Sequence, residues 1–254
     1  MTRWTALLLA GSRPGGDKFA ARYGAKMKAL IPLAGEPMVL RPLRALLDSK
    51  RVAEVRVLTQ EPDDIAAVLP DRARWSVEPS SGTIAETLEA LCKAPSARWP
   101  MLVTTADHAL LDSGMIEQFC AEAEGVDLAI AVVSKSSLMK RLPQSRRTWV
   151  GFRRGRYTGA NLFAFGSAKA LKAVDLWRSV EQDRKKGWRL LLTLGWPGIL
   201  GLLRLRTLDQ TLDAMGRRLG LSLRAVRLDD PLAAVDVDKP QDYDLVTAIL
   251  KRRS

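Results

Sequence analysis

The chain has 254 residues, of which 47% are hydrophobic and 27% charged, a composition that is typical of a globular protein and excludes a disordered one. Its 40 lysines and arginines outnumber its 28 acidic residues, and the net charge of +12 predicts attraction to an anion: a nucleotide, a phosphorylated substrate, nucleic acid or an anionic membrane. Cys92 and Cys120 form no CxxC pair, so we expect core thiols in a reducing cytoplasm rather than a disulfide framework or a zinc cluster. About six apolar residues precede the first glycine, too few for a signal peptide, and no stretch reaches the ~20 uninterrupted apolar residues of a spanning helix.

Strand and helix patterns alternate along the first part of the chain. An apolar run at 6–10 breaks into glycines, which predicts a short buried strand followed by a loop. In chain order we then expect a helix at 38–47, a strand at 52–59, short elements at 63–69 (helix) and 74–77 (strand), a helix at 84–91 capped by Ser81 or Thr83, and a strand at 99–105.

The alternation continues through the second part of the chain, around a basic region and a leucine-rich one. We expect a helix at 113–124, a strand at 127–133, a basic region at 135–156 with a strand at 149–152, an apolar segment at 162–165, helices at 167–177 and 207–219, a strand at 223–228, an extended segment at 234–238 and a closing helix at 241–250. This order predicts a mostly parallel α/β sheet in a single domain of residues 1–254, with a basic strand region at 135–165 and a helical subregion rich in leucine and tryptophan at about 176–220.

The opening segment has the features of a phosphate-binding site. A strand, a glycine-rich loop and then a lysine, Lys28, offer backbone N–H groups and a cation to a polyphosphate. The segment contains neither the Walker A pattern nor the G-x-G-x-x-G dinucleotide pattern.

Acidic residues lie where a divalent cation would be needed. Asp107 follows the clearest buried strand, and Asp236 and Asp238 lie far downstream. Ligands of parallel sheets bind beyond the carboxyl ends of the strands, and carboxylates there suit Mg²⁺ that also contacts substrate phosphates. Asp238 is favoured over Asp236 as the ligand.

With these motifs the chain resembles the nucleotidyltransferases of the GT-A-like fold, among them molybdenum cofactor guanylyltransferase, methylerythritol-phosphate cytidylyltransferase and the CMP-sugar synthetases. The matching residues are Leu9-Ala10-Gly11, Arg13, Lys28, Leu33-Ala34-Gly35-Glu36-Pro37-Met38, Asp107 and the closing Asp236-Val237-Asp238-Lys239-Pro240-Gln241-Asp242-Tyr243. Ala109 and Lys239 replace a proline and a threonine that are usual in the family. The resemblance implies a three-layer α/β/α fold with a mostly parallel central sheet, related to the Rossmann fold.

The resemblance also assigns expected roles. The triphosphate is expected at Ala10, Gly11 and Ser12 with the catalytic side chains of Arg13 and Lys28, and Mg²⁺ at Asp107 with Asp238 or Asp236. The base and ribose are expected at Ser80, Ser81, Gly82 and Thr83, and the acceptor at Gly159, Ala160 and Asn161. Spacing to Gly35 favours Lys28 over Lys18, which we expect in an extended loop that forms a flap.

The implied reaction moves a nucleoside monophosphate from an NTP, with CTP or GTP favoured, to a phosphorylated sugar, alcohol or cofactor, and releases pyrophosphate. An acceptor phosphate is already deprotonated, so in-line positioning and charge neutralisation matter more than a general base. The absence of a catalytic histidine or cysteine is therefore expected, and we assign the one histidine, His108, a local structural role.

Two other functions stay open at this point. One is a GT-A glycosyltransferase that uses an NDP-sugar, with Asp236-Val237-Asp238 as its metal motif. The other is a non-catalytic protein that binds anions or membranes. The stretch 188–205 leaves a peripheral membrane contact open, since arginines and tryptophans border its leucines, whereas the basic region 135–156 is expected to be a solvated surface and no nucleic-acid module is present.

Overall fold

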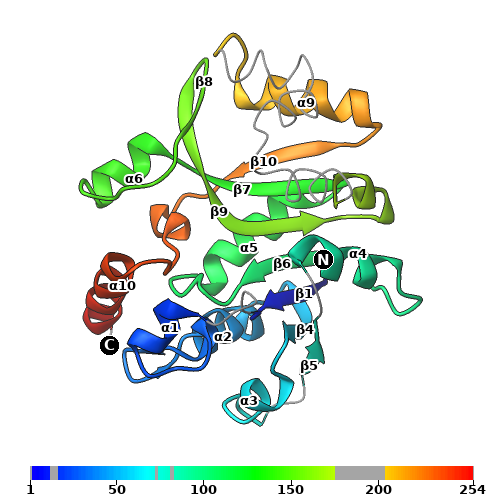
Figure 1. The fold of residues 1–254 in the computed structure, drawn as a ribbon. Coiled ribbons are helices and arrows are strands. Elements are labelled where there is room, and N and C mark those ends of the chain that lie inside the picture. The colour runs from blue at the N-terminus through cyan, green and yellow to red at the C-terminus, as the bar shows by residue number, and fades with distance from the viewer. Residues whose placement is uncertain (1, 12–16, 72–73, 81–82, 175–203, 254) are drawn as a thin grey trace.

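A computed structural model of the protein describes residues 2–11, 17–71, 74–80, 83–174 and 204–253. Its centre is an eight-stranded sheet (Figure 1), in which the strands follow the order β10-β7-β9-β6-β1-β4-β5 and β8 pairs with β9. The strands are β1 (Trp4–Leu9), β4 (Val52–Thr59), β5 (Trp75–Pro79), β6 (Met101–Thr105), β7 (Leu128–Ser134), β8 (Val150–Phe152), β9 (Gly155–Phe165) and β10 (Leu223–Arg227).

The sheet is mostly parallel, as the sequence predicts. β1 pairs in parallel with β4 and β6, β4 with β5, and β10 with β7. The exception is the long strand β9, which runs antiparallel to β6, β7 and β8. The carboxyl ends of β1, β4, β5 and β6 therefore lie along one edge, where parallel sheets bind their ligands.

Helices cover both faces and make three layers. Alternate residues of β1 point to opposite faces: Ala6 and Leu8 pack in a core with α2 (Leu40–Asp48) and α5 (Ser113–Ala123), whereas Leu7 packs in a second core with α4 (Ile84–Lys93). The expected α/β/α architecture is confirmed. Both free cysteines are buried in these cores, as expected.

A two-residue hairpin explains part of the opening motif. β2 (Pro32–Leu33) and β3 (Glu36–Pro37) pair across Ala34 and Gly35, whose φ angles are 51° and 89°. A tight hairpin turn needs positive φ at both central residues, which a glycine adopts without strain. Tyr243 in the closing helix α10 (Pro240–Arg253) donates its hydroxyl to the Pro32 carbonyl at 2.9 Å, so the opening and closing motifs are in contact.

Most predicted elements are confirmed with shifted ends, and several are corrected. The remaining helices are α1 (Lys18–Arg22), α3 (Pro62–Ala66), α6 (Lys135–Arg141) and α9 (Leu208–Leu219), with 3-10 helices at Lys28–Leu30, Ala168–Ala170 and Pro231–Ala234. The expected extended loop at Lys18 is wrong, because Asp17 accepts hydrogen bonds from the N–H groups of Phe19 and Ala20 and caps α1 there.

Three further expectations need the same kind of correction. The basic strand region begins with a helix, α6, because Ser134 caps it by accepting from the N–H of Ser137. The expected extended segment 234–238 begins with Ala234, the last residue of a 3-10 helix. The helix expected at 167–177 is a 3-10 turn that continues as helix through 171–174, beyond which the chain lies outside the described residues.

Among the described helices, none combines the length and the apolar character that crossing a membrane requires. Residues 188–203 of the predicted membrane-contact stretch lie outside the described part of the chain.

Candidate active site

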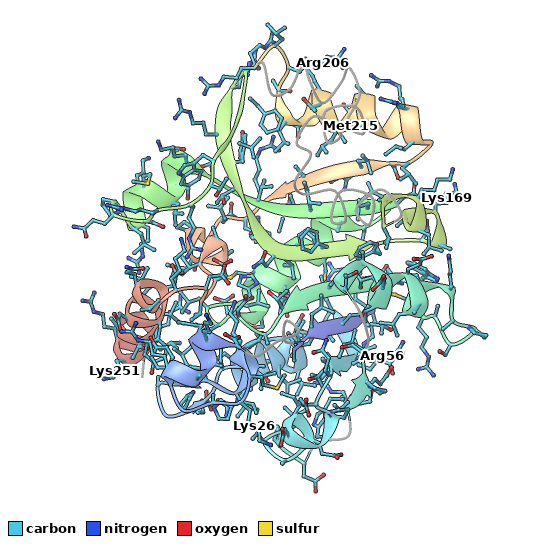
Figure 2. The ribbon with its side chains drawn as sticks, in the orientation of Figure 1. Lys26, Arg56, Lys169, Arg206, Met215 and Lys251 are labelled. Carbon is cyan, nitrogen blue, oxygen red and sulfur yellow. The ribbon has the colours of Figure 1, made fainter. Side chains whose placement is uncertain are left out.

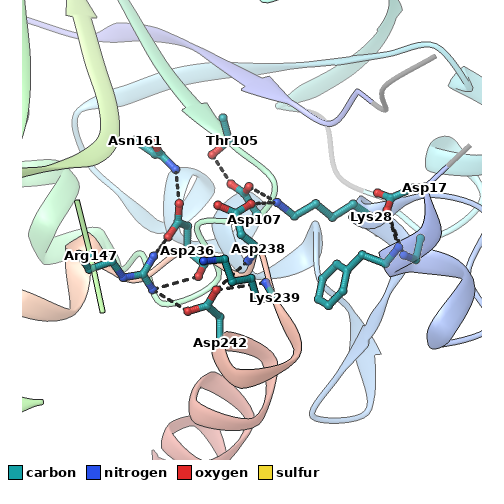
Figure 3. Close-up of polar contacts among 12 residues, drawn as sticks. Asp17, Lys28, Thr105, Asp107, Arg147, Asn161, Asp236, Asp238, Lys239 and Asp242 are labelled. Atoms are coloured by element: carbon teal, nitrogen blue, oxygen red, sulfur yellow. Dashed lines mark hydrogen bonds and ion pairs between the residues drawn. The ribbon is translucent and has the colours of Figure 1, made fainter. Parts of the chain in front are cut away.

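Lys28 joins two aspartates from distant parts of the chain (Figure 3). Its Nζ lies 2.5 Å from Oδ2 of Asp107 and 2.5 Å from Oδ1 of Asp238. Lys28 begins the first 3-10 helix, Asp107 follows β6, and Asp238 precedes α10. Three sequence motifs therefore meet at one ammonium group. We call Lys28, Asp107, Asp238, Asp236 and Arg147 the site cluster.

Neighbouring strands fix the position of Asp107. The N–H of Ala106 donates to the carbonyl of Leu9 at 2.9 Å, which ties the end of β6 to β1. Thr105 donates its hydroxyl to Oδ1 of Asp107 at 2.5 Å, and Val237 donates its N–H to the Asp107 carbonyl at 3.1 Å. The carboxylate is thus held from both the opening and the closing segments.

The ion pairs shift the pKa values of two members in opposite directions. Burial disfavours the charged ammonium of Lys28, but the carboxylates of Asp107 and Asp238 outweigh that effect and raise its pKa above the ordinary value. Burial likewise opposes ionisation of Asp238, yet its hydrogen bond from Lys28 lowers its pKa. Lys28 and Asp238 are therefore both charged at neutral pH in this arrangement.

Asp236 faces a different cation. Arg147 pairs its Nη1 with Oδ1 of Asp236, and Asn161 donates Nδ2 to Oδ2 of the same carboxylate at 3.2 Å. Burial raises the pKa of Asp236 above its usual value, while Arg147 opposes that shift. Asp236 and Asp238 therefore pair with different cations, Arg147 and Lys28, although only one residue lies between them in the sequence.

Arg147 also holds the start of the closing helix (Figure 3). Its Nη2 donates to the Asp236 carbonyl at 3.2 Å and to Oδ1 of Asp242 at 3.1 Å. The other oxygen of Asp242 accepts from the N–H groups of Asp238 and Lys239, at 3.3 and 3.1 Å. One guanidinium therefore orders the whole Asp236–Asp242 segment that presents Asp238.

The expectation that the basic region is only a solvated surface is wrong for Arg147, whose side chain is 11% exposed. Sequence reasoning missed this residue because nothing in its local motif separates it from the adjacent Arg146. A usable signal was present in the charge pattern: residues 128–174 hold ten basic and no acidic residues, so a buried arginine there must find its acid elsewhere.

Two of the three proposed metal ligands, Asp107 and Asp238, lie close enough together that they could share a divalent cation. Asp107 and Asp238 converge on the point where the Lys28 ammonium lies, so the pair already surrounds a positive charge. Two carboxylates supplemented by substrate phosphates are a usual Mg²⁺ environment. Asp236 points to Arg147, and among the described residues no three acidic, histidine or cysteine side chains gather in a way that would hold a metal by themselves.

The expected triphosphate segment is described in part. Ala10 donates its N–H to the Leu58 carbonyl at 2.8 Å, so that donor is already used. At Gly11 an added Cβ would lie 2.9 Å from Oε1 of Gln60, so the flexible end of that side chain would have to shift to make room for it. Ser12 and Arg13 lie outside the described residues.

A cavity of about 340 Å³ lies beside the expected base-binding segment. It opens between the ends of β4 and β5 and one face of α4, and its lining residues are Leu58, Pro79, Ser80, Glu86, Thr87, Ala90 and Leu91. Thr83 forms a capping box with Glu86, so its hydroxyl accepts from the Glu86 N–H and its own N–H is taken by the Glu86 carboxylate. Thr83 rather than Ser81 is the cap, and Ser81 and Gly82 lie outside the described residues.

The expected acceptor segment lies on β9 beside the site cluster. Asn161 has a φ of 42°, and its carbonyl accepts from the hydroxyl of Thr104 at 2.9 Å. Ala160 is buried in the core and Gly159 is exposed. Of the three, Asn161 alone contacts a member of the cluster through its side chain, among the contacts that the described residues make.

His108 is buried beside the end of β6. It is fully buried, its Nδ1 lies 3.3 Å from the Thr104 hydroxyl, and burial lowers its pKa to about 4. The imidazole is therefore neutral at physiological pH, which agrees with a structural role.

Comparison with known proteins supports the family that the sequence motifs indicate. Residues 6–197 match the family model of the MobA-like NTP transferase domain. No match is found among curated protein sequences. A hypothetical transferase from Thermus thermophilus is 29% identical, with a TM-score of 0.80 over 95% of this chain and 100% of that chain.

Two more distant structures share the fold. The 4-diphosphocytidyl-2C-methyl-D-erythritol synthase of Anaerococcus prevotii is 10% identical, with a TM-score of 0.63 over 99% of this chain and 97% of its own. A CMP:2-keto-3-deoxy-manno-octonic acid synthetase complexed with CTP is 13% identical, with a TM-score of 0.62 over 100% of both chains. The family match covers most of the chain, and the chain therefore belongs to the MobA-like NTP transferase family and is a nucleotidyltransferase.

Proposed function

We propose that this nucleotidyltransferase is Mg²⁺-dependent and transfers the nucleoside monophosphate of CTP or GTP to a phosphorylated small molecule. An oxygen of the acceptor phosphate attacks the α-phosphorus, the bond from that phosphorus to the bridging oxygen breaks, and pyrophosphate leaves with the electron pair. The contact of one lysine, Lys28, with both Asp107 and Asp238 is the observation that carries this proposal.

Charge neutralisation is the chemical argument for these three residues. Two carboxylates would repel a triphosphate, so they need a cation between them and the substrate. Mg²⁺ bound by Asp107 and Asp238 would supply that charge and polarise the phosphoryl oxygens. In our proposal Lys28 then leaves the carboxylates and binds the triphosphate, where its ammonium stabilises the charge that accumulates during transfer.

The remaining residues bind and orient the substrates. We place the triphosphate along Gly11, Ser12 and Arg13, and the base with its ribose in the cavity beside Ser80. Ser81, Gly82 and Thr83 border that segment, and Thr83 positions it by capping α4.

The acceptor is proposed at Gly159, Ala160 and Asn161. Asn161 and Arg147 keep the Asp236 carboxylate occupied, which leaves Asp238 as the metal ligand of the closing motif. CTP and a diphosphocytidyl group appear in the names of structures with this fold, and by analogy they support a cytidine nucleotide as donor.

Pyrophosphate release tests this function. The purified protein is incubated with CTP, GTP, UTP or ATP, with or without Mg²⁺, and with a panel of sugar and alcohol phosphates. We expect release only when Mg²⁺, one preferred NTP and one phosphorylated acceptor are present together. Release at the same rate in EDTA, or with unphosphorylated acceptors alone, would contradict the proposal.

A melting screen with the same nucleotides separates binding from turnover. We expect one NTP with Mg²⁺ to raise the melting temperature, and NDP-sugars to raise it less. A larger shift with an NDP-sugar would favour the glycosyltransferase alternative.

A further inference from the structure

The end of the molecule where β8 turns into β9 carries positive charge from two segments. We call it the hairpin-end surface and define it by Arg153, Arg154, Arg204, Leu205 and Arg206. Arg153 donates its N–H to the Arg206 carbonyl at 2.9 Å, so the β-hairpin and the segment before α9 meet there. Figure 2 shows Arg206 at this end of the molecule, and Lys251 at another.

Arg204 packs against β8 and so brings the two segments into contact. A Cβ added at Gly151 would lie 2.7 Å from Nε of Arg204, so the guanidinium side chain lies against the bare backbone of β8. The arginines of the two segments therefore share one surface although about fifty residues separate them in the sequence.

No acid in the described part of the chain pairs with the arginines of this surface. None of its four arginines forms an ion pair within the described part of the chain, and Arg153, Arg154 and Arg204 are exposed. Holding like charges together costs free energy unless an anion compensates them. An anionic partner is therefore the complementary ligand.

Exposed apolar side chains lie on the same two segments. Among described residues, the large hydrophobic side chains recorded as exposed are Leu205, at 60%, and Val150 in β8, at 39%. Leu205 lies between two arginines. Basic residues next to exposed aliphatic ones are typical of surfaces that bind the interface of an anionic bilayer.

Nucleic acid and a second copy of the chain fit this surface less well. Single-stranded nucleic acid needs free aromatic faces for stacking, but Trp149 packs on the core near Lys135, and Phe152 packs against Tyr157. A symmetric contact between two copies would place arginine against arginine.

We propose that the hairpin-end surface docks the protein on an anionic lipid bilayer. The arginines contact headgroup phosphates, and Leu205 enters the boundary with the acyl chains. β9 leads from this surface to the site cluster: the seven residues from Gly155 to Asn161 span roughly 20 Å. Docking would therefore hold the active site close to the membrane surface without occupying it.

Vesicle flotation of the full chain tests this proposal. We expect binding to vesicles of phosphatidylcholine with phosphatidylglycerol, little binding to phosphatidylcholine alone, and a decrease as salt rises. Arg153→Glu with Arg154→Glu is expected to lower the partition coefficient tenfold or more, since each basic residue near the surface contributes. The matched control, Lys251→Glu with Arg252→Glu, reverses the same charge at the exposed end of α10 and is expected to have a much smaller effect.

Leu205→Ser separates membrane docking from general attraction to polyanions. It keeps every charge, and we expect it to weaken vesicle binding several-fold while leaving binding to a single-stranded oligonucleotide unchanged. The proposal is overturned if both charge variants lose binding equally, if Leu205→Ser binds vesicles like the unmodified chain, or if the oligonucleotide binds and the vesicles do not. Circular dichroism and melting curves confirm that each variant is folded.

Discussion

Arg147 and Arg153 lie in the same basic region, but their surroundings differ in every respect that matters for function. Arg147 is 11% exposed and contacts two aspartates of the closing motif, whereas Arg153 is exposed and has no acidic partner among the described residues. The first orders a segment of the active site, and the second adds to an open positive surface. The role of an arginine therefore depends on whether an acidic partner lies within reach. A run of basic residues in the sequence does not by itself predict that role.

The largest effect is expected inside the site cluster. Asp107→Asn removes a carboxylate that we assign to Mg²⁺, and we expect pyrophosphate release to fall roughly 10³-fold. The matched control is Asp48→Asn, at the exposed end of α2, with unchanged activity. If Asp107→Asn keeps more than a tenth of the activity, the assignment of Asp107 as a metal ligand is wrong.

The next effect concerns the stability of the closing segment. Arg147→Ala leaves Asp236 and Asp242 without their shared cation in a largely buried position, which is expected to lower the free energy of unfolding by about 3 kcal/mol. Urea unfolding measures the change. Arg146→Ala, an exposed neighbour, is the control and should stay within about 0.5 kcal/mol. An equal loss of unfolding free energy in both variants would show that the buried arginine stabilises the protein no more than the exposed one.

A smaller effect is expected in the ionisation of Asp238. Its lowered pKa means that the pair with Lys28 adds stability above the unfolded-state pKa of about 4, and that this stability is lost as the pH falls through the folded-state value. In Lys28→Met the burial of Asp238 remains and the cation is gone, so we expect its pKa to rise. Carboxyl ¹³C NMR titration measures it, and a pKa that stays low would mean that another cation holds Asp238.

The smallest effect is expected at the hairpin-end surface. Arg153→Ala with Arg154→Ala removes exposed charges that have no described partner, so the free energy of unfolding should change by less than about 0.5 kcal/mol. Thermal and urea unfolding together check this. A loss of more than about 1.5 kcal/mol would show that these arginines are structural.

Sequence patterns predicted the layered fold because its strands are continuous apolar runs that lie between amphipathic helices. Val52–Thr59 was predicted with its observed ends. α6 was not predicted, and the first half of β9 was predicted only as part of a basic strand region at 135–165, because both sequences are polar and basic and their structure depends on contacts. Ser134 caps the helix, and the first half of β9 pairs with β7 and β8.

The residues in the motifs of the site could be predicted from the sequence, but the contacts between distant segments could not. The resemblance to the nucleotidyltransferases predicted Lys28, Asp107 and Asp238 as site residues, and Lys28 contacts both aspartates. No local pattern indicates that Arg147 reaches Asp236 and Asp242, since about ninety residues separate them. Likewise Lys18 follows a glycine pair like a catalytic lysine, but it lies in the first turn of α1, exposed and stabilised there by the cap at Asp17.

The comparison of Lys28 with Lys18 tests the central claim most directly. Steady-state pyrophosphate release is measured for the unmodified chain, Lys28→Ala and Lys18→Ala, with Mg²⁺, the preferred NTP and its acceptor. We expect Lys28→Ala to lose at least a hundredfold in kcat, and Lys18→Ala to stay within a few-fold of the unmodified chain. A Lys18→Ala protein that is more impaired than Lys28→Ala would contradict the account.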